Sequence, residues 1–404
     1  MKNDRLETIY SSLPEKAEKI AIVTHDLRES GGVAAVVSQI LLTSQYEKKR
    51  KFVIYSLSTK RLDPINLQAL RPKTWIKSIR EVVYRWNGHD VNHIGAIFSE
   101  FEVFRYLSFG RIKTRLKTYD KVIFVVGIAA WAFMFKGLRY DLYIASRVLE
   151  ERQSPKSKTI SAKKIYNKLN NVIVQKMELH AIRNANVLAV MNQKMSRWIN
   201  EKTHVNAKII YPGMCLPNTT LNELPLTIGQ NFKVISVARY NDPRKRADLV
   251  LQVYAKLRNF WPDIELTLVS MFPIDSELLK KYEEISTQVH INASKEDLRY
   301  LYDNSDIFLL MSDEEGFGMV LIEAMQSKSI VVSTMSGGPQ EIITDGVDGI
   351  LIPLGDVAAA VNKINKILEK PHKFASIANA ASKTVNQKFS LDSFNKNLTW
   401  TFKW

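Results

Sequence analysis

Two groups of charged residues in the second half of the chain stand next to glycines. Arg239 and Lys245 form a basic pair. Glu315 and Glu323 form an acidic pair, with Gly316-Phe317-Gly318 between them. Cations neutralise phosphate groups, carboxylates accept hydrogen bonds from hydroxyl groups, and a glycine-led helix start offers free N–H groups to phosphate. Together these residues predict a site for a substrate that carries both a diphosphate and sugar hydroxyl groups.

Each group follows an apolar run that predicts a buried strand. The basic pair follows Phe232–Val237, and the acidic pair follows Ile307–Met311 and leads into an apolar helix, Met319–Met325. A second glycine turn, Gly337-Gly338-Pro339, follows the short strand Ile330–Val332. Such a succession of strand, glycine turn and helix places the loops at the carboxyl ends of parallel strands, where open α/β sheets bind ligands.

Each carboxylate also has a structural explanation. Glu315, with Asp313 and Glu314, could be an acidic helix start favoured by the helix dipole. Glu323 could be a carboxylate held by a salt bridge in the core. Because both explanations would have to hold at this one spacing, the functional interpretation is favoured.

The alternation of strands and helices runs through the whole chain. In the first half, the strand Lys19–Thr24 opens into Gly31-Gly32 and the helix Val33–Leu42, without a G-x-G-x-x-G fingerprint. A polar stretch, Leu216–Gln230, is typical of a linker, and the pattern restarts at Phe232. We therefore expect an α/β protein with two doubly wound Rossmann-like domains facing across a cleft. The expected boundaries are 1–212, 213–388 and a tail helix, 389–404, that packs on the first domain.

The positive charge is concentrated in the first half. The 404 residues include 57 Lys or Arg and 41 Asp or Glu, a net charge of +16. Residues 1–205 hold 36 basic against 18 acidic side chains, and residues 206–404 hold 21 against 23. Such a field attracts acidic lipid surfaces, nucleic acid or polyanionic glycans. A generally basic, soluble surface is the alternative.

Composition also predicts the compartment. The single cysteine, Cys215, fits a reducing environment, and the polar segment Met1–Lys19 is no signal peptide. The longest uncharged apolar run, Val122–Phe135, is shorter than the roughly 20 residues of a spanning helix. We expect a cytoplasmic protein, with peripheral binding to the inner face of the cell membrane as a further hypothesis.

The stretch Lys48–Lys121 combines 17 basic and 6 acidic residues with many aromatic side chains. Trp75–Trp86 and Phe98–Lys117 are expected to form amphipathic helices, and an apolar face beside cations suits an anionic membrane surface. Packing of each helix on the domain core is the alternative. His89 and His93 are interpreted as surface histidines, and no metal motif is recognised in the sequence.

The stretch Glu315–Met325 resembles the E-x7-E signature of the retaining nucleotide-sugar glycosyltransferases of the GT-B fold, family GT4. Ala238–Lys245 resembles the family's Arg…Lys diphosphate site, with a spacing similar to that of bacterial phosphatidylinositol mannosyltransferases. Gly337–Gly349 resembles the family's next loop and turn, and Gly31-Gly32 its amino-terminal glycine loop. The resemblance is strong over residues 232–355 and weak over 45–180, where the acceptor usually binds.

The resemblance implies a role for each matched residue. Arg239 and Lys245 would hold the donor diphosphate, and Glu315 would meet the hydroxyl groups of the transferred sugar; these three are the expected catalytic residues. Glu323 would hydrogen-bond the ribose. The other expected donor contacts are Gly31, Gly32, His290, Gly316, Phe317, Gly318, Met319 and Val320. The resemblance implies no metal and no cofactor, and the donor would be a UDP- or GDP-sugar.

The sequence departs from the family pattern at three places. Family members often carry a His where the strand Lys121–Val126 leads into Gly127–Trp131, and none occurs here. Arg246 stands where a glycine often follows the Lys, and Ser270–Pro273 replaces a glycine-rich turn. These departures bear on the sugar and base rather than on the activity.

Together, the resemblance and the charge distribution predict a retaining glycosyltransferase. It would move a sugar from a nucleotide-diphosphate donor to a lipid-linked or anionic glycan acceptor in cell-envelope polysaccharide synthesis. Two alternatives remain open: a nucleotide-sugar epimerase of the same fold, and a non-enzymatic polyanion-binding protein. No nucleic acid partner is expected. The sequence names neither the sugar, the base nor the acceptor.

Overall fold

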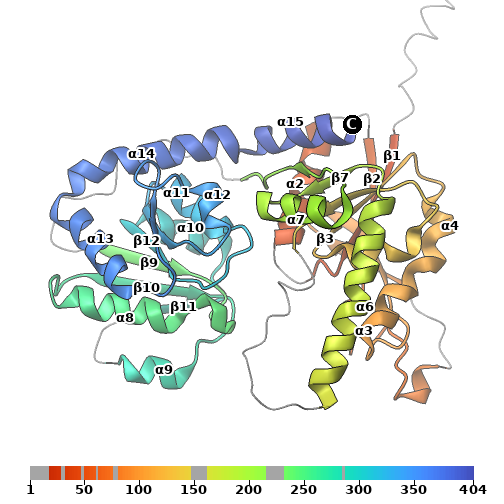
Figure 1. Cartoon of the computed structure of the whole chain (residues 1–404), viewed down its shortest axis with the longest axis horizontal. Coiled ribbons are helices and arrows are strands. Elements are labelled where there is room, and N and C mark those ends of the chain that lie inside the picture. The colour runs from red at the N-terminus through yellow and green to blue at the C-terminus, as the bar shows by residue number, and fades with distance from the viewer. Residues whose placement is uncertain are drawn as a thin grey trace, which may run out of the picture. The chain divides into compact units, whose positions relative to one another are not determined.

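The computed structural model describes residues 18–404 except 29–31, 47–49, 61, 76–80, 147–161, 215–231 and 284–286. Gly31 and the expected linker therefore lie outside the described residues. The chain forms two compact units, one comprising Met1–Pro212 with Asn395–Trp404 and the other Gly213–Phe394. Each unit is built on one mainly parallel sheet with helices packed around it (Figure 1).

The first unit contains an eight-stranded sheet in the order β3-β4-β2-β1-β5-β6-β7-β8. All neighbouring strands run parallel except β3 and β4. Its central strands are continuous apolar runs, as expected for a parallel sheet covered on both faces. The strands are β1 (Glu18–His25), β2 (Arg50–Leu57), β3 (Glu81–Trp86), β4 (His89–Ile94), β5 (Lys121–Val126), β6 (Asp141–Ile144), β7 (Leu188–Val190) and β8 (Lys208–Ile209).

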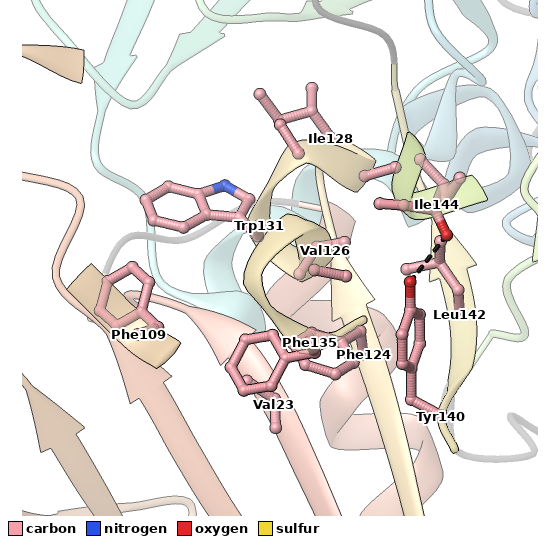
Figure 2. Packing of buried hydrophobic residues seen from close by; sticks show 14 of the residues in the cluster. Val23, Phe109, Phe124, Val126, Ile128, Trp131, Phe135, Tyr140, Leu142 and Ile144 are labelled. Atoms are coloured by element: carbon pink, nitrogen blue, oxygen red, sulfur yellow. Dashed lines mark hydrogen bonds between the residues drawn. The ribbon is translucent and has the colours of Figure 1, made fainter. Parts of the chain in front are cut away.

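An aromatic core joins the centre of this sheet to the helices beside it. The ring of Phe124 lies 4.8 Å from that of Phe135 and 5.2 Å from that of Tyr140, and the Tyr140 hydroxyl donates to the carbonyl of Ala181 at 2.7 Å (Figure 2). The helices are α2 (Gly32–Tyr46), α3 (Glu102–Leu107), α4 (Lys113–Leu116), α6 (Ala162–Asn184) and α7 (Gln193–Thr203), with 3₁₀ segments η1 (Pro72–Thr74), η2 (Ser108–Ile112) and η3 (Ala129–Phe135).

Two helix predictions in the basic stretch are wrong. In place of a helix over Trp75–Trp86, β3 pairs with β4 as an antiparallel hairpin. Its turn is Asn87-Gly88, with φ of 47° and 80°, and Asn-Gly is the favoured pair for such a two-residue turn. Phe98–Lys117 is not one helix either, because η2 separates the short helices α3 and α4.

The second unit contains a six-stranded parallel sheet in the order β11-β10-β9-β12-β13-β14. In chain order this is 3-2-1-4-5-6, the dinucleotide-fold order, which reverses between β9 and β12. The strands are β9 (Lys233–Val237), β10 (Glu265–Ser270), β11 (Thr287–Ile291), β12 (Ile307–Leu310), β13 (Ile330–Thr334) and β14 (Ile350–Ile352). The helices are α8 (Ala247–Arg258), α9 (Ser276–Lys281), α10 (Lys295–Asp303), α11 (Met319–Gln326), α12 (Pro339–Ile342), α13 (Val357–Glu369) and α14 (Pro371–Lys388), with the 3₁₀ turn η4 (Pro243–Lys245).

The last helix, α15 (Leu391–Phe402), takes the chain back to the first unit. There the Lys121 ammonium donates to the carbonyl of Lys403 at 2.7 Å. The ring of Trp404 lies 5.8 Å from that of Phe52. The end of the chain is therefore part of the first unit's packing.

Candidate active site

The loops that follow β9, β12 and β13 lie at one edge of the second sheet, because these strands are parallel neighbours. Two of them flank the point where the strand order reverses. Open α/β sheets bind ligands at this place. The loops carry the basic pair, the acidic loop and the second glycine turn of the sequence.

The turn after β9 brings Lys245 to the acidic loop. Asp242 caps η4 by accepting a hydrogen bond from the main-chain N–H of Arg244 at 3.1 Å. Lys245 is only 8% exposed, and its Nζ lies 2.6 Å from Oε2 of Glu315 and 3.4 Å from the carbonyl of Glu314. The ammonium is thus held between a carboxylate and a main-chain oxygen.

Further contacts fasten the two loops together. The carbonyl of Arg244 accepts a hydrogen bond from the main-chain N–H of Asp313 at 2.8 Å, and the Arg244 guanidinium lies 3.6 Å from Glu314. Arg246 has a φ of 51°, a left-handed conformation that glycine adopts without strain, which accounts for the glycine at this position in the family pattern. Its guanidinium contacts Asp248 at 2.8 Å and Asp313 at 3.1 Å, contacts that a glycine lacks.

The acidic loop is also paired with the second glycine turn. The main-chain N–H of Glu315 donates to the carbonyl of Ser336, and the carbonyl of Glu315 accepts a hydrogen bond from the main-chain N–H of Gly338, both at 2.9 Å. A Cβ on Gly338 would lie 2.2 Å from the carbonyl oxygen of Phe317, so only glycine fits there. Gly318, at φ 101°, precedes the first turn of α11. The start of α11 is therefore set by two interlocked glycine turns.

Glu323, the second carboxylate of the acidic pair, lies within α11 and has a different partner from Glu315. Oε2 of Glu323 accepts a hydrogen bond at 2.9 Å from the hydroxyl of Tyr302, a buried residue of α10. Burial raises the pKa of Glu323 to about 7, against the opposing effect of the Tyr302 hydrogen bond. Near neutral pH this group therefore changes between a protonated carboxyl, which can donate a hydrogen bond, and a carboxylate, which only accepts one. No local sequence signal marked Tyr302, which precedes Glu323 by 21 residues.

The structure places the remaining predicted donor contacts as follows. Arg239 is exposed just after β9, and its side chain makes no ion pair or hydrogen bond with the described residues. His290 is half-buried on β11, the edge strand. Phe317 is buried against Phe389, with ring centroids 5.9 Å apart, so only its main chain is available to a ligand. Gly316 is exposed, and Met319 and Val320 are half-buried.

Gly32 begins α2 in the first unit and is exposed. Gly31 lies among the residues that the structure does not describe. The structure thus brings together Lys245, Glu315 and the two glycine turns, whereas the roles of these residues, and of Gly31 and Gly32, stay predictions.

The first sheet carries a charged cluster that the sequence did not predict. Nη2 of Arg28 lies 2.6 Å from Asp26, 2.5 Å from Asp63 and 2.9 Å from Nε2 of His93. The hydroxyl of Ser56 lies 2.9 Å from Nδ1 of His93. The interpretation of His93 as a surface histidine is wrong, since it is 1% exposed. Its strand, β4, is covered on both edges by β3 and β2, which a spacing of histidines does not reveal.

Asp26, Asp63 and His93 have the spacing of a three-ligand metal group. In this structure, however, the guanidinium of Arg28 stands among all three and supplies the positive charge. Burial alone would raise the pKa values of Asp26 and Asp63, but the hydrogen bonds from Arg28 and further hydrogen-bond and charge effects together outweigh it, so both pKa values are lowered. The cluster holds the chain that leads from β1 towards α2.

Two Rossmann-like units with this site define a protein of the GT-B class. Residues 225–384 match the family described as glycosyl transferases group 1, which confirms the resemblance of the second unit to family GT4. It is 27% identical over 219 residues to the alpha-1,3/1,6-mannosyltransferase ALG2 of Mus musculus, a match that covers 48% of this chain and 52% of the relative. The chain thus spans about half the length of this curated relative.

One further relative and one solved structure are also similar to this chain. A mannosyltransferase of Mycolicibacterium smegmatis, described as GDP-mannose-dependent and acting on phosphatidylinositol monomannoside, is 27% identical over 146 residues, covering 33% of this chain and 38% of the relative. The structure of Anabaena HepE in complex with UDP-glucose superposes with a TM-score of 0.66 at 18% identity. That match covers 95% of this chain and 99% of HepE. The GT-B fold predicted from the sequence is confirmed.

Proposed function

We propose that this protein is a retaining glycosyltransferase that transfers a sugar from a nucleotide-diphosphate donor to a glycan or lipid-linked acceptor. The observation that carries the proposal is the 2.6 Å pair between Lys245 and Glu315, at the strand-order reversal of the second sheet. It places a cation for phosphate beside a carboxylate for sugar hydroxyl groups. The family match over residues 225–384 supports the same assignment.

In the reaction, the bond between the anomeric carbon and the diphosphate oxygen breaks, and a bond to the acceptor hydroxyl oxygen forms. The acceptor proton passes to the leaving phosphate, so no separate protein base is needed. Lys245 and the exposed Arg239 neutralise the charge that develops on the diphosphate. The free N–H groups at the start of α11 act on the same anionic substrate.

The two carboxylates hold different parts of the donor. Glu315, beside Lys245, accepts hydrogen bonds from the transferred sugar. Glu323, beside Tyr302, hydrogen-bonds the ribose of the nucleotide. The interlocked glycine turns fix the distance between these groups before the donor binds, which lowers the cost of ordering the site on binding.

The donor is identified by thermal shift with a panel of UDP- and GDP-sugars. A ligand present at 100 times its Kd stabilises the folded state by about 2.7 kcal/mol. The true donor therefore raises Tm, and the acceptor need not be known for this test. Release of the free nucleotide with transfer to an acceptor supports the proposal. Isomerisation of the donor alone indicates an epimerase, and a flat response to every nucleotide sugar contradicts the donor site.

The acceptor is proposed to be lipid-linked and presented at an anionic membrane surface. An aromatic surface, defined as Trp75, Phe98, Phe101 and Phe104, forms a chain of ring contacts 5.8–6.1 Å apart. Trp75, Phe101 and Phe104 are 57%, 40% and 44% exposed, and the exposed cations Arg71 and Lys73 adjoin Trp75 in the chain. Exposed aromatic rings beside cations suit an anionic lipid surface. Among the described residues, no helix is long and apolar enough to cross a membrane.

A further inference from the structure

A cavity of about 600 Å³ opens in the first unit at the amino ends of β5, β6 and β7. These strands run parallel, so the cavity lies at the sheet edge opposite the loop after β5, where a GT-B site would be sought. Its volume is in the range of small-molecule sites. The charged and polar residues that matter here are Lys117, Lys121, Arg139, Asp141, Asn186 and Lys403.

The carboxylates of this cavity have partners of their own. The Asp141 carboxylate accepts a hydrogen bond from the side-chain amide of Asn186 at 3.0 Å, and burial raises its pKa. The Asp120 carboxylate, also in the lining, accepts the main-chain N–H of Lys19 at 2.7 Å. The charges of Lys121 and Arg139 also act on Asp141, where they oppose the rise in its pKa.

The cations nevertheless outnumber these carboxylates. Four cations line the cavity against two carboxylates, and among the described residues Lys121 is the one that forms an ion pair, with Glu18 at 3.0 Å. Within the described part of the chain, the side chains of Lys117, Arg139 and Lys403 make no hydrogen bond or ion pair. All three are exposed and therefore free to close on a ligand.

The floor of the cavity is buried, whereas the cationic side chains at its rim are exposed. Tyr140 is buried in the aromatic core, as Figure 2 shows, and its hydroxyl donates a hydrogen bond to the carbonyl of Ala181. Lys121 is tied to the carbonyl of Lys403, which brings the last turn of the chain to the wall. Long cationic side chains thus surround a buried base, an arrangement that suits a ligand with several negative charges.

We propose that this cavity binds a ligand carrying two or more phosphate groups. Arg139 offers a planar fork for one phosphate, and Lys117 and Lys403 act as point charges for another. The phosphate can belong to a free phosphorylated molecule or to a phosphate-bearing polymer chain. The inference does not depend on the proposed transferase activity, because its residues are outside the donor site.

Tripolyphosphate is a suitable probe, titrated calorimetrically into the full chain. Since the donor site also attracts phosphates, the background carries Arg239→Ala and Lys245→Ala. On that background, the variant Lys117→Gln/Arg139→Gln/Lys403→Gln is compared with the control Lys168→Gln/Lys176→Gln/Lys202→Gln. The control also removes three positive charges, but from exposed positions of the first unit that do not line the cavity. Thermal unfolding and the donor-induced Tm shift, measured without the background changes, check that each variant is folded.

The expected result is saturable binding at one site, weakened about tenfold or more by the cavity variant and unchanged by the control. A glycerol-phosphate oligomer that binds more tightly than tripolyphosphate assigns the phosphates to a polymer, and the reverse order assigns them to a free ligand. Equal weakening by the control means that the ligand senses only the general positive field, and overturns the proposal. So does the absence of saturable binding.

Discussion

The ammonium of Lys245 lies 2.6 Å from the carboxylate of Glu315, although 70 residues separate them in the chain. The contact exists because β9 and β12 are neighbours in the sheet and their following loops meet at one edge. It joins the two charged groups that the sequence presents separately. The first prediction tests this pair.

Lys245→Ala and Glu315→Ala should each lower the transfer rate by about 10²–10³-fold, because each removes a group that stabilises the charged transition state. Steady-state kinetics with the donor found by thermal shift gives the rates, and circular dichroism reports the fold. Lys256→Ala, an exposed position on α8, is the matched control and should leave the rate unchanged. Near-normal turnover of either site variant would refute the assigned roles.

Glu323 should make stability depend on pH. Its pKa rises to about 7 in the folded state from 4.5, so the folded protein retains a proton that the unfolded chain releases. Stability is therefore fully present below about pH 4.5 and is lost as the pH rises through 7. Urea unfolding at pH 5 and pH 8 measures the loss.

Relative to Glu323→Gln, which does not titrate, the wild-type protein should lose about 2–3 kcal/mol between these pH values. Parallel pH profiles for the two proteins would show that the Glu323 carboxyl is already ionised at pH 5.

Gly338→Ala should destabilise the second unit by about 2 kcal/mol or more, because the new Cβ would meet the main chain of Phe317. The interlocked turns would separate, and donor affinity would fall with stability. Gly316→Ala is the control for stability, since a Cβ there meets nothing within 4 Å. Differential scanning calorimetry compares the two. Equal Tm values would contradict the interlocking.

Arg28→Ala should cost about 3–5 kcal/mol, because it leaves the buried carboxylates of Asp26 and Asp63 without their cation. The loss should be greatest at neutral pH and should shrink in acid, where both carboxyl groups become protonated. Arg115→Ala breaks the more exposed pair with Glu81 and should cost less than about 1 kcal/mol. Denaturant titration measures both; similar costs would show that the cluster is not a buried ionic centre.

Phe101→Ser/Phe104→Ser should weaken binding to anionic vesicles, because it removes apolar area from the aromatic surface. Co-sedimentation with vesicles that contain anionic lipid measures binding, and neutral vesicles should bind less. Phe260→Ser, at a residue 64% exposed in the second unit, is the control and should have no effect. Binding that survives the double substitution would exclude this surface as the membrane contact.

The GT-B fold was predicted from the resemblance of the Glu315–Met325 stretch to the GT4 signature, whereas the alternation of apolar runs, glycine turns and helices was enough to predict two parallel α/β units. It was enough because buried parallel strands must be apolar throughout and their turns require small residues. The motif around Glu315 could be predicted for the same reason, because its strand, glycine turn and helix are adjacent in the sequence. The hairpin over Glu81–Ile94 differs from the predicted helix although its Asn87-Gly88 turn is a local signal, because cationic and aromatic residues occur in hairpin strands as well as in amphipathic helices.

Other features could be known only from the folded chain. Sheet order decides which loops meet, and so it decides that Lys245 reaches Glu315 and that His93 is buried beside Arg28. Packing of α10 against α11 gives Glu323 its Tyr302 partner and its raised pKa. Amino acid types and spacing determined which chemistry this chain can perform. Contacts between distant residues decided where each charge is held, because burial and pairing depend on neighbours that local sequence does not specify.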